Sequence, residues 1–403
     1  MNKILFLLSL SLMFFFACGS EDELVNPKDP KEEEEEEVEI IPKSKAEVLF
    51  DQIFSYYWSE EVELLYGNYS HSLSPQKPTS PEYNVHAYLW GFGGALSAFN
   101  AIAHSSPSPD FFKQYASKLK TALLQYYTPN RMPRGFACFV NGHDERFYDD
   151  AIWVGIDLVE LYMLTKDDWY LDYAEIVWDF VMSGHDNVLG GGIYWKEVPK
   201  DSKNTCSNAP AAVLGVKLYE ATDDQKYLDK AKDIYAWVKN NLQDPKDNLY
   251  WDNKKLDGRV ETWKFSYNSG QMLQAGVLLY NATNNDQYLY EAKLLAEASY
   301  NEFFDKHFVS GLSGEQFPII KDGHVWFNAI MIRGFIELDQ IEKNSSYMTA
   351  IKKSLVHGWN YARDTNTGLL KSNLSGRNFE HADQSGDILF QGALAEMLAR
   401  LGM

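Results

Sequence analysis

A repeated pair of helices constrains this sequence more than any other feature. The segments LYMLTKDDWYLDYA (161–174), LYEATDDQKYLDKA (218–231) and LYNATNNDQYLYEA (279–292) share Leu-Tyr, a Thr three residues after that Tyr, and a later Tyr-Leu-x-x-Ala. Each segment reads as the end of one helix, a polar turn with Asp or Asn, and the start of a second helix. A repeat of this kind predicts a series of helical hairpins.

Weaker copies extend the series at both ends. They cover 86–127 and 325–362, and a last helix is expected at 388–401 with no helix after it. A helix near 45–58 supplies the missing partner and closes the ring. The first helices carry small, apolar faces and the second helices are amphipathic, as inner and outer helices should be. We therefore predict an all-α fold, an (α/α)6 toroid of six αα-hairpins in a closed barrel, with strand-rich insertions near 190–195.

The repeat also aligns a set of polar residues. Asp150, Ser207 and Asn268 each stand twelve residues before the shared Tyr. The starts of the inner helices should therefore share one rim, at the mouth of the central cavity. Polar side chains from separate repeats would meet there: Asp149, Asp150, Asn204, Asn208, Tyr267, Asn268 and Gln271. Such convergence indicates a site.

Asp149 and Asp150 are adjacent at the head of one apolar helix. One Asp is a good helix cap and suits the positive end of the helix dipole, but two like charges repel and only one can be the cap. Cleavage of a glycosidic bond needs two carboxyl groups in different protonation states, and retention of configuration requires them to lie about 5–5.5 Å apart. From spacing alone, a catalytic pair and a cap beside a solvated Asp both stay open.

Four motifs carry a resemblance to a known family. FYDDAIW, GGGIYW, KNTCSNAPAA and FSYNSGQ, in this order and spacing, resemble glycoside hydrolase family 76, the endo-α-1,6-mannanases. The resemblance extends over the chain from about residue 45, and the Asp-Asp pair followed by Trp is its most specific part. It implies an (α/α)6 barrel and retaining hydrolysis of the α-1,6-linked backbone of fungal-type α-mannan. It also implies that Asp149 is the nucleophile and Asp150 the acid/base, with Tyr148 in the aromatic position before the pair.

Aromatic rings stack on sugar faces, and amides bind sugar hydroxyls. The residues expected to bind substrate are therefore Tyr148, Trp153, Trp195, Asn204, Asn208, Tyr267, Asn268, Gln271 and His86. Packing is the ordinary alternative for each aromatic residue, and capping is the ordinary alternative for each amide. Trp153 in particular lies one helical turn inside and could only buttress the aspartates.

Three other readings compete with a hydrolase. His86, His324 and His381 lie near the starts of inner helices, and sugar epimerases on similar toroids use histidines for proton transfer. Capping or hydrogen bonding is the more ordinary role for these histidines. A non-catalytic glycan-binding lipoprotein would keep aromatic residues and amides without needing two adjacent carboxylates. A structural scaffold would not need the polar rim.

The N-terminal residues predict export. Residues 1–17 resemble a lipoprotein signal peptide that ends before Cys18, the expected lipidation site; a simple cleaved signal is the alternative. Residues 18–44 form an expected acidic, flexible tether that carries −8 of the formal net charge of −20, and 45–403 the catalytic domain. Because the chain is acidic, we do not expect it to bind nucleic acid. We expect a monomeric outer-membrane lipoprotein, exposed at the cell surface, that meets the membrane only through its lipid and takes a polysaccharide or oligosaccharide as substrate.

The remaining cysteines, Cys138 and Cys206, form no disulfide framework or metal-binding spacing, and their pairing depends on a distance that the sequence does not give. The segment GHDNVLGGG (184–192) could be imagined as a calcium loop, but Asp and Asn are equally at home in a Gly-rich turn. We expect no metal and no cofactor.

Overall fold

The computed structural model describes residues 42–69, 85–106, 108–140, 145–377 and 386–403. Twelve α-helices lie within these ranges, and residues 42–403 form one compact unit. Six helices make an inner ring: α3 (Leu89–Ser105), α5 (Tyr148–Thr165), α7 (Thr205–Thr222), α9 (Ser266–Thr283), α11 (Val325–Ile341) and α13 (Ile388–Arg400). The outer six are α1 (Lys45–Tyr57), α4 (Pro109–Leu124), α6 (Asp168–Met182), α8 (Gln225–Leu242), α10 (Asp286–Phe303) and α12 (Ser345–Tyr361).

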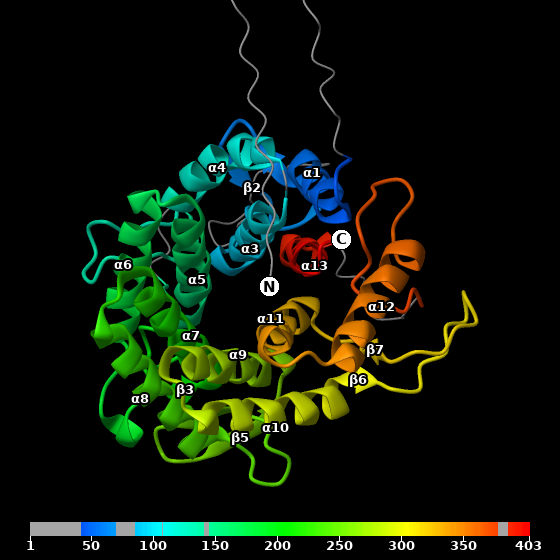
Figure 1. Cartoon of the computed structure of the whole chain (residues 1–403). Coiled ribbons are helices and arrows are strands. Elements are labelled where there is room, and N and C mark those ends of the chain that lie inside the picture. Colours follow the sequence, from blue (N-terminus) through cyan, green and yellow to red (C-terminus); the bar gives the residue numbers. More distant parts are fainter. Residues whose placement is uncertain (1–41, 70–84, 107, 141–144, 378–385) are drawn as a thin grey trace, which may run out of the picture. The chain divides into compact units, whose positions relative to one another are not determined.

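Inner and outer helices alternate along the chain, and together they close a ring (Figure 1). The predicted (α/α)6 toroid is therefore confirmed. The last inner helix, α13, packs against both α3 and α1, so the first helix of the unit is the outer partner of the last. Gly94 and Gly392 allow the close approach of α3 and α13, because a Cβ on Gly392 would lie 2.5 Å from the Gly94 carbonyl carbon.

The repeated motif corresponds to one turn used three times. The inner helices α5, α7 and α9 end in residues with positive φ of 57°, 58° and 54°, and the next residue caps the outer helix with its side chain. The hydroxyl of the motif Thr accepts a hydrogen bond from the backbone N–H two residues later and donates to a backbone carbonyl of the inner helix. The three pairs of Thr acceptor and backbone donor are Thr165 with Asp167, Thr222 with Asp224, and Thr283 with Asn285.

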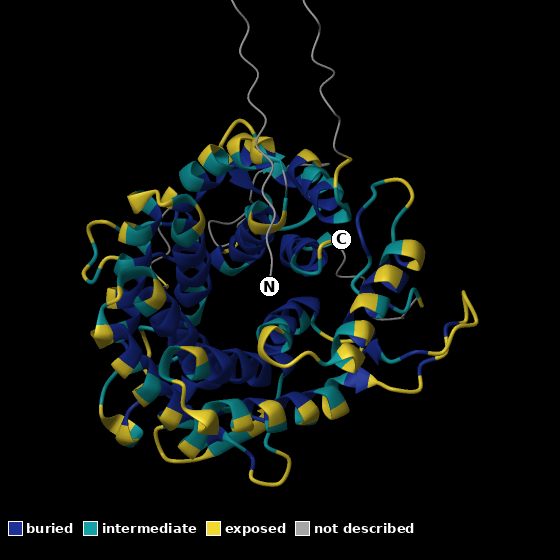
Figure 2. Cartoon of the chain, viewed as in Figure 1, coloured by how far each residue is buried: buried dark blue, intermediate teal, exposed yellow. Residues whose placement is uncertain are grey.

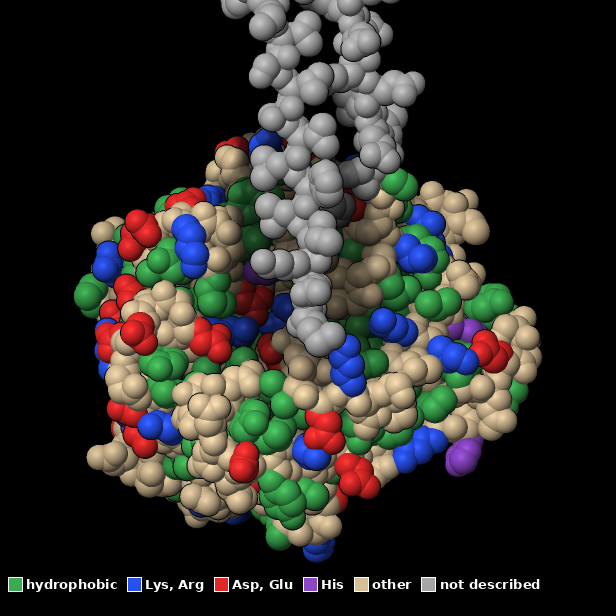
Figure 3. Space-filling view, viewed as in Figure 1, with side chains coloured by type: hydrophobic (Ala, Val, Ile, Leu, Met, Phe, Trp, Pro, Cys, Tyr) green, Lys and Arg blue, Asp and Glu red, His purple; other side chains and the backbone are tan. Residues whose placement is uncertain are grey.

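The inner helices are buried around most of their circumference, whereas the outer helices are exposed on one face (Figure 2). Acidic and basic side chains are interspersed on the described surface in the view of Figure 3. No helix of the described part of the chain is both long and apolar enough to cross a membrane.

The strands are short and lie mostly outside the expected segment 190–195. β1 (Trp58–Ser59) pairs with β2 (Leu64–Leu65), and β6 (Phe304–Asp305) with β7 (Ile319–Ile320). A three-stranded sheet joins β3 (Ser202–Asn204) to the hairpin of β4 (Trp251–Lys255) and β5 (Val260–Lys264), all antiparallel. Segment 190–195 contains isolated bridges, of which Tyr194 with Lys203 ties it to β3, and a 3-10 turn (Val188–Gly190) precedes it. The sheet lies where inner helices α7 and α9 begin.

A charged network lies deeper in the ring, and side chains from all six inner helices take part in it. Glu160 of α5 forms an ion pair with Lys217 of α7 at 2.9 Å. Arg333 of α11 pairs with Glu396 of α13 at 2.7 Å. The other members are Ser97 and Asn100 of α3, Asp157 of α5, Gln274 of α9, Glu337 of α11 and Arg400 of α13.

Candidate active site

The starts of the inner helices meet at one cavity, as the repeat predicts. The second residues of α3, α5, α7, α9 and α11 are Trp90, Asp149, Cys206, Tyr267 and Trp326, and all five line the same cavity of about 480 Å³. This volume is typical of a site for a small ligand or a short oligosaccharide. One position of a structural repeat therefore supplies the floor of the site.

The other lining residues come from α5 and α11 and from the loops and strands around them. They are Tyr88, Cys138, Phe147, Asp150, Trp153, Trp195, Asp201, Ser202, Asn204, Asp252, Asn253, Lys255, Phe265 and Phe327. Aromatic rings gather on the α9 and α11 side, where Tyr267 stacks on Phe327 with ring centroids 4.1 Å apart. Carboxylates and amides occupy the α5 side and the three-stranded sheet. A cavity with an aromatic wall and a polar wall suits a sugar, which has apolar faces and hydroxyl edges.

Asp149 is held by two neutral donors on one of its oxygens. The indole Nε1 of Trp195 donates to Oδ2 at 3.1 Å, and the thiol of Cys206 donates to the same oxygen at 3.3 Å. Burial raises the pKa of Asp149 to about 6, although these two bonds and the backbone N–H groups at the helix start oppose the rise. Asp149 is therefore ionised at neutral pH.

Asp150 has a poorer set of donors. Burial and the charge of Asp149 raise the pKa of Asp150 well above its usual range, and a hydrogen bond from the Cys138 thiol offsets only part of that rise. Of the two neighbours, Asp150 is the one that keeps its proton. The pair therefore holds one carboxylate and one carboxylic acid side by side, as acid-assisted glycoside cleavage requires.

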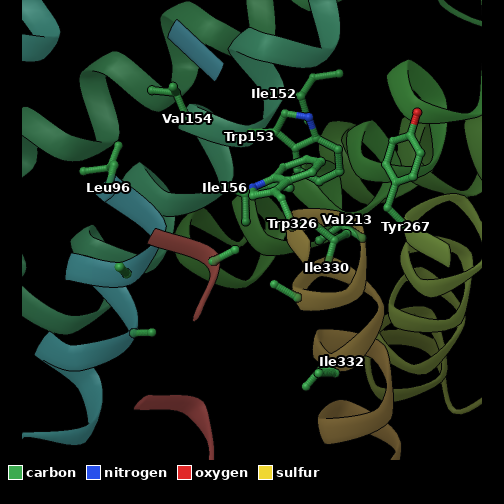
Figure 4. Close-up of a cluster of buried hydrophobic side chains, with 14 of the residues drawn as sticks. Leu96, Ile152, Trp153, Val154, Ile156, Val213, Tyr267, Trp326, Ile330 and Ile332 are labelled. Atoms are coloured by element: carbon green, nitrogen blue, oxygen red, sulfur yellow. The ribbon is translucent and has the colours of Figure 1, made fainter. Parts of the chain in front are cut away.

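Four of the predicted substrate-binding residues line the cavity beside the aspartate pair: Trp153, Trp195, Asn204 and Tyr267. Trp195 also contacts Asp149 directly. The ring of Trp153 meets that of Trp326 edge to face, with ring centroids 4.8 Å apart (Figure 4). Trp153 therefore buttresses the aromatic wall as well as lining the cavity.

Five predicted binding residues lie outside the cavity lining. Tyr148 is 1% exposed and packs on Phe180 with ring centroids 4.8 Å apart. Asn208 bonds the backbone of Ile193 through both its amide oxygen and its amide nitrogen. The other three are Asn268 and Gln271, both buried inside α9, and His86, which stacks on Tyr66.

Neither His86 nor His324 lines the cavity. His324 occupies the N-cap position of α11 without a side-chain capping bond, and its ring stacks on those of Trp90 and Phe327. Burial lowers its pKa to about 4, so its ring is neutral at physiological pH. His381 lies outside the described residues.

Several cavity residues were missed by the sequence analysis. Asp252 and Asn253 lie on β4 and both line the cavity, and burial raises the pKa of Asp252. Cys138 and Cys206 are both free thiols, and each contacts one aspartate of the pair. The sequence signal for Cys206 was its position, one residue before Ser207, which the repeat aligns with Asp150 and Asn268.

The suggested calcium loop is occupied by protein groups. Asp186 accepts hydrogen bonds from Lys203 at 2.6 Å and from Tyr194 at 2.9 Å. Among the residues that the structure describes, no three His, Cys, Asp or Glu side chains are grouped to hold a metal ion.

Comparison with known proteins agrees with this fold. The solved structure of the family 76 mannosidase Bt3792 from Bacteroides thetaiotaomicron VPI-5482 is 34% identical and covers 89% of this chain and 97% of its own, with a TM-score of 0.81. The α-1,6-mannanase GH76A of Salegentibacter sp. HEL1_6 is 25% identical and covers 88% of this chain and 97% of its own, with a TM-score of 0.71. A mannan endo-1,6-alpha-mannosidase (DCW1) of Candida glabrata is 30% identical over 213 residues, or 49% of this chain. That match spans 46% of the Candida protein, less than half of its length.

The family comparison covers the ring itself. The family model described as Glycosyl hydrolase family 76 matches residues 42–370, from the start of the compact unit to beyond α12. The match includes the aspartate pair, the three-stranded sheet of β3, β4 and β5, and five of the six inner helices. On this match the chain belongs to glycosyl hydrolase family 76.

Proposed function

We propose that this protein is a retaining glycoside hydrolase that cleaves α-1,6-mannosidic bonds within the backbone of fungal-type α-mannan. The observation that carries the proposal is the pair of adjacent carboxyl groups with opposite surroundings on the cavity floor. The names of the similar proteins, a mannosidase and α-1,6-mannanases, support the choice of bond.

The roles of the two aspartates follow from their surroundings. Asp150 donates its proton to the glycosidic oxygen while the Asp149 carboxylate attacks the anomeric carbon, so the leaving sugar departs with a hydroxyl and a glycosyl ester forms on Asp149. Asp150 then takes a proton from water, the water oxygen attacks the anomeric carbon, and Asp149 leaves as a carboxylate. The first step needs Asp149 ionised, and both steps need Asp150 able to exchange a proton.

Product analysis on unbranched α-1,6-mannan tests the proposal. We expect short manno-oligosaccharides from the wild type, and a loss of roughly 10³-fold or more in rate for Asp149→Asn and Asp150→Asn. Asp172→Asn, an exposed change on outer helix α6, is the matched control. Binding of mannan without any product would replace the hydrolase by a glycan-binding protein, and full activity in either pair variant would return that Asp to a cap.

Two further readouts fix the class of cleavage. Proton NMR of the first products should show the α-anomer, since retention is expected. Chain-length analysis should show long chains shortened early in the reaction, because internal cutting reduces polymer size before monosaccharide accumulates. Release of mannose alone from the start would show terminal cutting.

We also propose that the chain is a lipoprotein anchored through Cys18 and held off the outer membrane by the acidic residues 18–44. Charge repulsion keeps such a segment extended, which would let the ring reach a polymer outside the cell. Labelling with a radioactive fatty acid in a Gram-negative host should mark the wild type and leave Cys18→Ala unlabelled. Protease treatment of whole cells would test surface exposure, and light scattering of the chain without residues 1–18 should give the mass of a monomer.

The epimerase reading is not favoured by the site. Neither His86 nor His324 lines the cavity, and the buried His324 ring is neutral at physiological pH. Incubation with mannose or manno-oligosaccharides in deuterated water should therefore leave the sugars free of deuterium on carbon.

A further inference from the structure

A thiol stands between the aspartate pair and the aromatic wall. Cys206 is the second residue of α7 and is 4% exposed, and its sulfur donates to Oδ2 of Asp149 at 3.3 Å. Tyr267 lies close to the same sulfur on the α9 side. Tyr267, Cys206 and Asp149 are the second residues of α9, α7 and α5, and the hydrogen bond from Cys206 to Asp149 joins two of these helices.

The direction of the hydrogen bond between Cys206 and Asp149 is set by the protonation of the thiol. Burial and the nearby charge of Asp149 raise the pKa of Cys206 well above its usual range, so the sulfur keeps its hydrogen. A neutral thiol beside a carboxylate can only donate to it. Because the bond forms to the charged state of Asp149, it stabilises that state against protonation.

The surroundings of the pair contain few competing charges. Both side chains that donate to Asp149, Trp195 and Cys206, are neutral. The titratable and charged groups around the aspartate pair are Tyr88 before α3, Cys138 and Glu145 before α5, Asp201 before β3, Asp252 and Lys255 on β4, and Tyr267 on α9. The acidic groups among them favour a protonated Asp149, and the two neutral donors oppose protonation together with the backbone N–H groups at the start of α5.

We propose that Cys206 is a positioning residue for hydrolysis: the hydrogen bond from its thiol fixes Oδ2 of Asp149 and favours the charged carboxylate that attacks. The inference rests on the proposed role of Asp149 as the nucleophile. A weak donor suits that role, because a cationic donor would stabilise the carboxylate more and reduce its nucleophilicity.

The pH dependence of kcat/KM on α-1,6-mannan tests the inference in Cys206→Ala and Cys206→Ser. We expect Cys206→Ala to shift the acidic limb of the kcat/KM profile to higher pH by roughly 0.5–1 unit, since ionised Asp149 loses one of its two side-chain donors. The value of kcat should fall while KM changes less than about two-fold, because the bond positions the nucleophile and does not touch the substrate. Cys206→Ser keeps a donor and should return the limb close to the wild-type position.

Tyr267→Phe provides the second arm, since it removes a hydroxyl close to the thiol and leaves both side-chain donors to Asp149 in place. We expect a shift of the acidic limb in the same direction and smaller than that of Cys206→Ala. An unmoved limb in Cys206→Ala, with a loss of rate that follows a lower melting temperature, would assign Cys206 to packing and overturn the inference.

A titration without substrate separates this inference from the proposed function. Carbon-13 NMR of labelled Asp carboxyl groups, with the Asp149 signal assigned by its loss in Asp149→Asn, reports the pKa directly. A higher pKa of Asp149 in Cys206→Ala supports the thiol role even if the wild type leaves mannan uncut, in which case the hydrolase proposal fails alone. Hydrolysis of mannan with an unchanged Asp149 pKa in that variant overturns the thiol role alone.

Discussion

Replacement of Asp157 by Asn should stabilise the ring at alkaline pH far more than at acidic pH. Asp157 lies on α5 in the buried charged network, below the cavity floor, and is fully buried. Ser97 donates to its Oδ2 at 2.5 Å and Asn100 donates to its Oδ1 at 2.9 Å. Burial raises its pKa; Arg333 opposes the rise and the charges of neighbouring glutamates add to it, so that the result is about 7.

The magnitude follows from linkage between protonation and folding. An unfolded Asp has a pKa of about 3.9, so a folded pKa of about 7 means that folding favours the protonated form. The stabilisation is fully present below the unfolded pKa of about 3.9, and it is lost as the pH rises from there through the folded pKa of about 7. Between pH 5 and pH 8 the wild type should lose about 2.6 kcal/mol relative to a side chain that cannot ionise. For a ring of about 360 residues this corresponds to roughly 3 °C in melting temperature.

Calorimetry of wild type and Asp157→Asn at pH 5 and pH 8 measures this difference. The effect of the amide on hydrogen bonding to Ser97 and Asn100 is common to both pH values and cancels in the comparison. Asp172→Asn, an exposed change on outer helix α6, should give equal shifts at both pH values. An equal shift for Asp157→Asn at pH 5 and pH 8 would refute a carboxyl that titrates near neutrality.

Three further outcomes follow from contacts elsewhere. Trp195→Phe keeps the ring but removes the indole donor to Asp149, so the acidic limb of kcat/KM should move to higher pH by roughly 0.5–1 unit; an unmoved limb would contradict the role of this bond. Gly270→Ala places a Cβ 2.2 Å from a backbone Cα of α11, and urea unfolding should show a loss of about 3 kcal/mol in the free energy of unfolding. The Cβ of Gly93→Ala meets nothing within 4 Å, so this control should be neutral or slightly stabilising. Similar values for the two variants would contradict the tight packing of α9 on α11. Arg146→Met removes a buried cation that bonds a glutamate through two nitrogens, and unfolding experiments should show a loss of about 3–5 kcal/mol.

The ring could be predicted from the sequence because its turns are local. A Thr, a residue in the left-handed conformation and a capping Asp or Asn occur in a fixed order at 165–167, 222–224 and 283–285. Each of these contacts joins residues within a few positions of one another, so the sequence alone records it. Closure by 45–57 was predictable for a different reason, since one unpaired helix remained at each end of the series.

The binding residues were harder to predict because of helical register. The alignment compared the third residues of the inner helices, whereas the cavity is lined by the second ones. Each step along a helix turns a side chain by about 100°, so a shift of one position takes Asn268 out of the cavity and leaves Tyr267 in it. Asp149 and Asp150 both reach the cavity, as does Asn204 just before α7, whereas Asn208, Asn268 and Gln271 do not line it.

The different protonation of the two aspartates arises from contacts that no local pattern contains. Asp149 receives its donors from Trp195, beyond α6, and from Cys206 on the next inner helix, at sequence separations of 46 and 57 residues. Asp150 faces Cys138 and the charge of its own neighbour. Adjacent residues on one helix start with equal intrinsic acidity, so the ring must break that equality by what each repeat places opposite them. The fold therefore serves the chemistry by surrounding two identical side chains with different neighbours, and the thiols, which look incidental in the sequence, are part of that difference.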